Sequence, residues 1–245
     1  TTTFRPPYTP LTFGTIVGRN IGEYFDTFRR TPMNDWHLEN KAEFENVGQW
    51  KRAWYYPKNN ETMHDAVQRE SMAARNSAGI LDASTLGKID IQGTDASEFL
   101  NRVYTNAWSN LAIGKCRYGL MLNEDGMVYD AVVTTRLDEN HYIMTTTTGG
   151  AANVLGKLED YLQTEWPELD VYLSSVTDHY ATASICGPNS KKILNKLIPD
   201  LDLSDESFPQ MYFKTAKIDN IKCRIMRISF TGEQSYEINI QANYG

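Results

Sequence analysis

The sequence lacks several features that mark specialised classes of protein. Its 245 residues contain only three cysteines, Cys116, Cys186 and Cys223, which lie far apart and in no paired spacing. Such a set does not support a disulfide framework and favours a reducing, cytoplasmic compartment. No segment approaches the roughly 20 consecutive apolar residues that a membrane-spanning helix needs. The sequence therefore predicts a soluble protein without a disulfide scaffold.

Basic charge is also scarce. The chain has 24 Lys and Arg against 31 Asp and Glu, a formal net charge of −7, and no Lys/Arg-rich run. Because binding to nucleic acid by counterion release needs clustered basic residues, a nucleic-acid partner is not expected. Apolar residues make up 41% of the chain, enough for a buried core. The length suits one large domain, or a domain with an extension.

Several common catalytic motifs are missing as well. The sequence has no Gly-x-Gly-x-x-Gly, no phosphate loop and no Gly-x-Ser-x-Gly elbow, and its four histidines show no metal-ligand spacing. A dinucleotide site, a P-loop NTPase and a zinc hydrolase are therefore disfavoured, and no metal site is predicted.

The chain divides into two parts by composition. Residues 1–56 have little hydrophobic periodicity and carry aromatic side chains among charged ones, whereas disordered tails are usually poor in aromatics. We expect an irregular, aromatic-rich arm or linker there, packed on its own domain or on a partner subunit. One domain is expected over residues 57–245. Because the chain begins without Met and ends on a strand-like run, we expect a fragment of a longer protein.

Local patterns predict individual elements within this domain. Thr62 and Asp65 form a capping-box pattern ahead of a helix over 63–78. A second helix is predicted over 95–105, capped by Thr94, because its apolar residues recur on one face. A turn at 123–126 that ends in Asp-Gly predicts a β-hairpin. Other helices and strands are expected at 80–92, 118–122, 127–136, 141–147, 151–163, 171–176, 180–186, after Pro188, and within 213–240.

The order of these elements indicates the fold class. Strands are joined by hairpins rather than by regular strand-helix-strand alternation, so an α+β fold is predicted. The order strand, helix, hairpin, helix, strand is typical of a ferredoxin-like unit.

Two acidic residues stand out chemically. On a strand over 127–136, Asp130 shares a face with apolar Val128 and Val132, where a carboxylate must find a partner or shift its pKa. Glu233 follows Thr-Gly in a predicted turn, from which a carboxylate can accept two parallel N–H bonds from a flat amino-pyrimidinone ligand. The alternatives are a hydrogen-bonded Asp130 at a sheet edge without function and a solvated Glu233 in an ordinary turn.

Both acidic residues belong to a longer series of motifs in register. The series comprises Gly79-Ile80-Leu81-Asp82-Ala83-Ser84, Gly93-Thr94-Asp95-Ala96, Tyr118-Gly119-Leu120-Met121-Leu122-Asn123, Gly126 with Asp130, Cys186-Gly187-Pro188, and Phe230-Thr231-Gly232-Glu233 with Tyr236-Glu237. Over residues 73–240 it resembles the folate-binding family of glycine-cleavage aminomethyltransferases, the T-proteins. Residues 4–10, 30–37, 50–57 and 145–152 resemble the branch of that family formed by α subunits of heterotetrameric sarcosine oxidases.

The resemblance implies a fold, a cofactor and site residues. The expected fold is T-protein-like with ferredoxin-like units, truncated before the family's C-terminal β-barrel. Tetrahydrofolate is the cofactor implied for this domain, with a flavin and a dinucleotide elsewhere in the full complex. The family's catalytic aspartate is carried over to Asp130, because its usual aspartate pair stands here as Tyr129-Asp130. Glu233 is expected to bind the pterin edge, and Tyr118 to line the pocket or to serve as a core residue.

The resemblance also implies a reaction and partners. In the oxidase branch, sarcosine is oxidised at a flavin to an imine, and tetrahydrofolate captures its former methyl carbon as 5,10-methylenetetrahydrofolate, leaving glycine. The implied partners are the other oxidase subunits, a folate and the sarcosine-derived imine, and the fragment alone is not expected to oxidise sarcosine. A stand-alone folate-dependent aminomethyltransferase or methyltransferase and a non-catalytic folate-binding assembly protein remain as alternatives.

Overall fold

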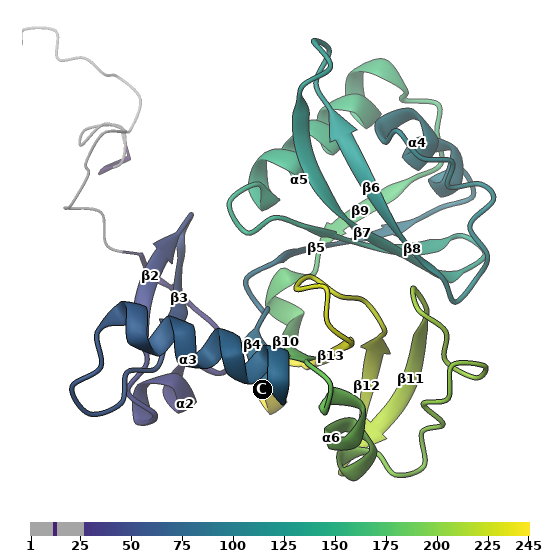
Figure 1. Cartoon of the computed structure of the whole chain (residues 1–245). Coiled ribbons are helices and arrows are strands. Elements are labelled where there is room, and N and C mark those ends of the chain that lie inside the picture. Colours follow the sequence, from purple (N-terminus) through teal and green to yellow (C-terminus); the bar gives the residue numbers. More distant parts are fainter. Residues whose placement is uncertain (1–11, 14–26) are drawn as a thin grey trace, which may run out of the picture.

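The structure, a computed structural model, describes residues 12–13 and 27–245 (Figure 1). Its helices and strands are mixed, as the sequence predicts for an α+β fold. Within the described residues the strands form three sheets, one of three strands and two of five. No helix in this part of the chain is long and apolar enough to cross a membrane.

The first sheet lies ahead of the longest helix. It has the order β1 (Arg29–Arg30), β3 (Trp50–Tyr55), β2 (Glu43–Val47), with α2 (Asn34–Glu39) between β1 and β2. The sequence predicts an irregular arm here, and that prediction is wrong for these residues. Gly48 at φ 58° allows the tight turn that pairs β2 with β3, and the strands are too short to show a period. Residues 1–11 and 14–26 of the predicted arm lie outside the described residues, and the domain boundary after residue 56 stays a prediction.

Helix α3 (Met63–Asn76) follows the first sheet and begins as its sequence predicts. The side-chain oxygen of Thr62 accepts from the backbone N–H of Asp65 at 3.3 Å, and the carboxylate of Asp65 accepts from the N–H of Thr62 at 3.0 Å. This reciprocal capping box satisfies two N–H groups that the first helical turn leaves unbonded. The helix ends two residues earlier than predicted.

The third sheet in chain order carries the ferredoxin-like part of the fold. Its strands are β6 (Cys116–Leu122), β7 (Val128–Asp138), β8 (His141–Thr146), β5 (Gly87–Gln92) and β9 (Tyr172–Ser175). Helices α4 (Ala96–Val103) and α5 (Ala151–Asp160) cover one face, where their apolar residues and those of the strands form a single core (Figure 1). Helix α5 continues as the π-helical turn η2 (Tyr161–Glu165).

Two predictions in this region need correction. The single strand-like run at 80–92 is two strands, because β4 (Gly79–Asp82) pairs in another sheet and residues 83–86 cross to β5. Helix α4 is preceded by Asp95 and not capped by Thr94, whose hydroxyl instead donates to the carboxylate of Asp170 at 2.9 Å. The predicted hairpin between β6 and β7 is confirmed, with Gly126 at φ 80° in its turn.

The remaining sheet is antiparallel and completes the fold. Its order is β11 (Phe213–Ile218), β12 (Ile221–Met226), β13 (Ser235–Gln241), β10 (Tyr180–Cys186), β4. Helix α6 (Ser190–Leu197) packs on this sheet. The short helix η3 (Thr177–His179) directly precedes β10, and the short helix η4 (Ala242–Tyr244) follows β13. A second apolar core includes Leu194, Phe208 and Tyr236, each fully buried. The three cysteines are unpaired and buried.

The capping box gives a direct test of the local structure at α3. Replacing Thr62 by Ala removes the acceptor for the Asp65 N–H and should lower the free energy of unfolding by about 1 kcal/mol. Thr62→Ser keeps the hydroxyl and should stay within a few tenths of wild type. Chemical denaturation of the three proteins checks this, and equal stability of the Ala and Ser variants would contradict it.

Candidate functional site

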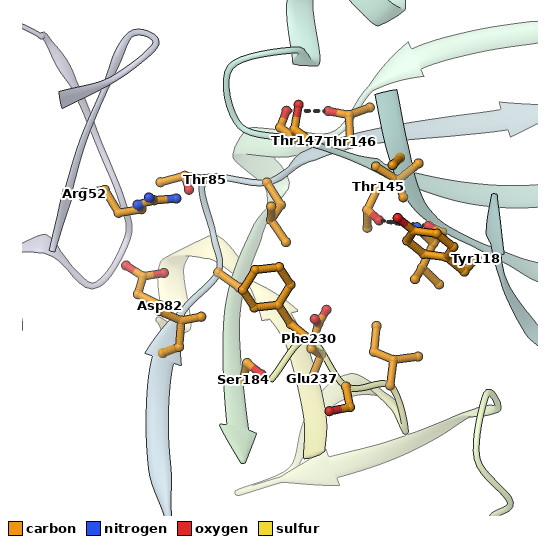
Figure 2. A pocket seen from close by; sticks show the side chains of 18 residues that line it. Arg52, Asp82, Thr85, Tyr118, Thr145, Thr146, Thr147, Ser184, Phe230 and Glu237 are labelled. Atoms are coloured by element: carbon orange, nitrogen blue, oxygen red, sulfur yellow. Dashed lines mark hydrogen bonds between the residues drawn. The ribbon is translucent and has the colours of Figure 1, made fainter. Parts of the chain in front are cut away.

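A cavity of about 240 Å³ lies where the three sheets meet (Figure 2). The first sheet contributes Arg52, and β4 with the crossing segment contributes residues of 81–86. The third sheet contributes Tyr118 and residues 131–133 and 145–147. The wall is closed by residues 228–230 from the loop between β12 and β13, together with Ser184 and Glu237. Each of the three sheets is therefore needed to form the cavity.

The carboxylate of Glu237 is the most unusual group in the wall. Glu237 lies on β13 beside Ser184 of β10 and is only 7% exposed. Burial raises its pKa to about 7, the charge of Lys88 acts against that rise, and no described residue contributes a hydrogen bond. A buried carboxyl without a hydrogen-bond partner is costly for the fold alone, and it is typical of a group kept for a ligand.

Lys88, on β5, is the buried cation that acts on Glu237. Its ammonium donates to the backbone carbonyls of Ser84 at 3.2 Å and Leu86 at 2.9 Å, and the residue is 1% exposed. Burial lowers its pKa to about 8, against the opposing effect of nearby carboxylates that include Glu237. Because both groups have pKa values displaced toward neutrality, the charge of this region changes within a narrow pH range.

Asp82 lines the cavity and is held by a buried chain of hydrogen bonds. Its carboxylate lies 2.9 Å from Nε2 of His37, whose Nδ1 lies 2.6 Å from the hydroxyl of Tyr56. Burial raises the pKa of Asp82, but hydrogen bonds from His37, Ser84 and Thr31 outweigh it, so the pKa is lowered overall. Burial and the charge of Asp82 raise the pKa of Tyr56 to about 12. This chain connects α2 and the segment after β3 to β4 and so fixes one side of the cavity.

Two aromatic rings provide flat surfaces beside these polar groups. Phe230 is 89% exposed although it lines the cavity, and Tyr118 is 54% exposed. Figure 2 shows the Phe230 ring projecting into the space above Glu237, with Tyr118 on the side of the third sheet. Exposed rings next to a buried carboxylate suit a planar ligand that carries hydrogen-bond donors on one edge.

The sequence-predicted site residues are only partly brought together. Tyr118 lies in the cavity wall. Asp130 is 3% exposed and accepts from the backbone N–H of Thr147 at 3.3 Å, so it lies behind a lining residue and does not itself line the cavity. Asp130 lies opposite Met121 of β6, which belongs to the apolar core, so its side chain is on the core side of β7. Its catalytic role stays a prediction.

Glu233 also lies outside the wall. Its carboxylate is 2.7 Å from Nη1 of Arg75 on α3, and a hydrogen bond from Thr231 lowers its pKa, with Arg75 acting in the same direction. The loop that carries it does line the cavity, through residues 228–230. Its predicted role as the residue that binds the pterin edge likewise stays a prediction.

Sequence reasoning did not assign roles to Glu237, Arg52, Asp82 or Phe230. A signal for Glu237 exists in the run Ser235-Tyr236-Glu237-Ile238-Asn239, where polar residues alternate on a strand. Such alternation normally marks a solvated face. Here the polar residues of that face are buried, because the third sheet lies across it.

Comparison with known proteins agrees with this architecture. The GCVT N-terminal domain family matches residues 33–245, and the chain belongs to that family. It is 54% identical over its whole length to sarcosine oxidase subunit alpha of Corynebacterium sp. (strain P-1) and 46% identical to that of Rhizobium meliloti (strain 1021). The chain spans about a quarter of the length of these relatives. It is also 28% identical, over 87% of its length and 55% of the relative, to an aminomethyltransferase of Thermotoga sp. (strain RQ2).

Solved structures show the same fold. The glycine cleavage system aminomethyltransferase T from Bartonella henselae superposes with a TM-score of 0.74 at 24% identity, covering 89% of this chain and 55% of that one. A chain of the heterotetrameric sarcosine oxidase from Corynebacterium sp. U-96 gives a TM-score of 0.52 at 16% identity, with 88% of each chain covered. The predicted T-protein-like fold is therefore confirmed.

The raised pKa of Glu237 predicts a pH-dependent stability. Because its pKa is about 7 in the fold against 4.5 in the unfolded chain, its contribution is complete below pH 4.5 and is lost as the pH rises to about 7. Glu237→Gln removes this loss, so the difference in free energy of unfolding between variant and wild type should grow by an amount on the order of 3 kcal/mol across this range. Denaturant unfolding between pH 4 and pH 8 measures it. A difference that does not change with pH would show that Glu237 titrates normally.

Proposed function

We propose that the chain is the tetrahydrofolate-binding part of a sarcosine oxidase α subunit. In this proposal it transfers the methylene unit of oxidised sarcosine to tetrahydrofolate, giving 5,10-methylenetetrahydrofolate and glycine. The observation that carries the proposal is the buried Glu237 carboxylate, which shares one cavity with two exposed aromatic rings. Its similarity to sarcosine oxidase α subunits over the whole chain supports the choice of reaction.

Glu237 supplies the recognition step in this proposal. The amino-pyrimidinone edge of a pterin carries a ring N–H and an amino group side by side, and one carboxylate can accept both bonds. These bonds are stronger in a buried site than in water, because the local dielectric constant is lower. Phe230 and Tyr118 would contact the faces of the ring system. Ligand binding would thereby supply hydrogen bonds to a carboxyl that receives none from the described residues.

The chemistry requires little more than positioning and control of charge. The iminium formed from sarcosine carries the one-carbon unit. In the transfer, two N–H bonds of tetrahydrofolate would be replaced by bonds to that carbon, the C–N bond to glycine would break, and the amino group of the departing glycine would take up both protons. Holding the reactants together without bulk water favours transfer over hydrolysis, which would give formaldehyde. Asp130 is proposed to stabilise the positive charge and to accept a folate N–H proton on its way to the glycine amino group, from its position behind Thr147. Oxidation itself is assigned to a flavin outside this segment, in an assembly with other subunits that would act in the cytoplasm.

Two alternatives have specific support. Similarity to the Thermotoga aminomethyltransferase over 87% of the chain favours a folate-dependent aminomethyl or methyl transfer without an oxidase. The position of Asp130 outside the cavity wall favours a folate-binding protein that does not catalyse the transfer. The first is separated from the main proposal by whether the full-length protein oxidises sarcosine, and the second by the Asp130 variant described below.

A matched pair of variants tests which glutamate binds the ligand. Glu237→Gln should weaken tetrahydrofolate binding by the full-length protein at least ~10-fold, because a charged hydrogen bond contributes roughly 1.5–3 kcal/mol. Wild-type affinity should rise with pH through about 7, since only the ionised carboxylate accepts both bonds, and this dependence should be absent in the variant. Glu233→Gln, on the neighbouring loop, serves as the control. Titration calorimetry decides, and a larger loss in the Glu233 variant would restore the sequence-based assignment.

The role of Asp130 is tested by where the one-carbon unit goes. Asp130→Asn keeps the size of the side chain but removes its charge, so methylene transfer should slow by at least ~10²-fold. Sarcosine oxidation should continue, and the product should shift from 5,10-methylenetetrahydrofolate to formaldehyde. Product analysis of the complete oxidase with saturating tetrahydrofolate measures this. An unchanged product ratio would remove Asp130 from the mechanism.

A further inference from the structure

The cavity wall contains one basic residue, and the proposed reaction gives it no role. Arg52, on β3, is the only Lys or Arg among the described residues that line the cavity, whose other charged lining residues are Asp82 and Glu237. Its side chain is 32% exposed, whereas Glu237 is 7% exposed. The positive charge therefore lies nearer to solvent than the buried carboxylate, and the two come from different sheets (Figure 2).

The hydrogen bonds of Arg52 leave part of its guanidinium available. Both Nε and Nη2 donate to one oxygen of Glu45 on the adjacent strand, at 3.0 Å and 2.6 Å. In the part of the chain that the structure describes, Nη1 has no hydrogen-bond partner. Because a guanidinium carries five N–H donors in a rigid plane, Glu45 fixes its orientation without using all of its donors. The remaining donors are available to an anion.

The order of charges across the cavity narrows the choice of ligand. A volume of about 240 Å³ accommodates a bicyclic ring but not a complete folate, so the rest of the ligand must leave through the opening. A ligand that matches this site carries hydrogen-bond donors on its inner end and a carboxylate on its outer end. Tetrahydrofolate has this arrangement, with the amino-pyrimidinone at one end and glutamate at the other.

We infer that Arg52 binds a carboxylate of the glutamate tail and so selects tetrahydrofolate over tetrahydropterins that lack the tail. This inference rests on the proposed function, since it takes Glu237 as the inner anchor of the same ligand. Arg52 is then a specificity residue and takes no part in the chemistry. Glu45 holds it in place, which lowers the entropy lost when the tail binds.

The test compares two ligands in the full-length protein in its native assembly. Tetrahydrofolate and 6-methyltetrahydropterin are titrated anaerobically into wild type, Arg52→Gln, Arg52→Lys and Arg102→Gln. Arg102 is a matched control, because it lies on α4, pairs with Glu98 and does not line the cavity. Wild type should prefer tetrahydrofolate by at least ~10-fold, and this preference should fall as salt is raised from about 50 to 500 mM, since a half-exposed ion pair is screened.

The variants separate tail recognition from ring recognition. Arg52→Gln should abolish most of the preference while leaving affinity for 6-methyltetrahydropterin within about 2-fold of wild type. Arg52→Lys, which keeps the charge but loses the planar fork, should retain part of the preference and serves if the Gln variant does not fold. Arg102→Gln should behave as wild type.

Every other outcome overturns either the role of Arg52 or the proposed function. A preference that survives in Arg52→Gln, or an equal loss of both ligands in that variant, overturns the assignment of Arg52 while leaving the proposed function in place. If wild type binds neither ligand, the proposed function fails and the inference fails with it. Binding that persists in Glu237→Gln would place the ligand at another site, and the inference would fail for that reason.

Discussion

The site depends on a carboxyl group that the fold buries and that receives no hydrogen bond from the part of the chain that the structure describes. Glu237 occupies a central strand, between β10 and β12, at a position where an apolar residue would stabilise the packing more. The cost is reduced because the side chain becomes neutral near pH 7 and because Lys88 supplies an opposing charge. Proteins commonly give up stability in this way where a ligand must be bound. The surrounding wall can be understood as the structure that keeps water and other hydrogen-bonding groups away from the carboxyl of Glu237.

The polar groups around the cavity are organised in different ways, and the differences suit different tasks. Asp82 is ionised and fully engaged by His37 and by the backbone after it, so it contributes to structure. Arg52 is charged, and Glu45 accepts from only some of its N–H groups. Its guanidinium is therefore held in one orientation while the other N–H groups remain available to a ligand. The carboxyl of Glu237 accepts no hydrogen bond from the described residues, and burial raises its pKa to about 7. A single cavity thus contains a fixed charge, an oriented charge and a titratable one.

Local patterns in the sequence predicted much of the fold but little of the wall. The capping box at Thr62, the Asp-Gly hairpin and the apolar face of α4 depend on neighbours along the chain, and the structure confirms them. The break between β4 and β5 was missed, because the composition of residues 80–92 is strand-like throughout and only pairing shows that two sheets share it. The short strands of the first sheet were missed because two to six residues are too few to show a period.

The same reasoning explains the partial success with the site. The sequence predicted that Asp130 would be buried on a strand, and it is. It did not predict which face of the sheet meets the cavity, because that depends on how the other sheets pack. The assignment of Glu233 rested on turn chemistry and on the family resemblance, and Glu237 was not considered. The turn brings Glu233 to Arg75, and the strand after it brings the carboxylate of Glu237 into the cavity wall. A distance of four residues along the chain thus separates a carboxylate paired with Arg75 from one in the cavity wall.

The four-residue crossing from β4 to β5 has a mechanical consequence. Ala83, Thr85 and Leu86 line the cavity, and the same short segment joins the two five-stranded sheets covalently. Its carbonyls also hold the ammonium of Lys88, which influences Glu237. Any rotation of one five-stranded sheet against the other must therefore change the width of the cavity. It must also change the electrostatic potential near Glu237, because the same stretch of backbone controls both.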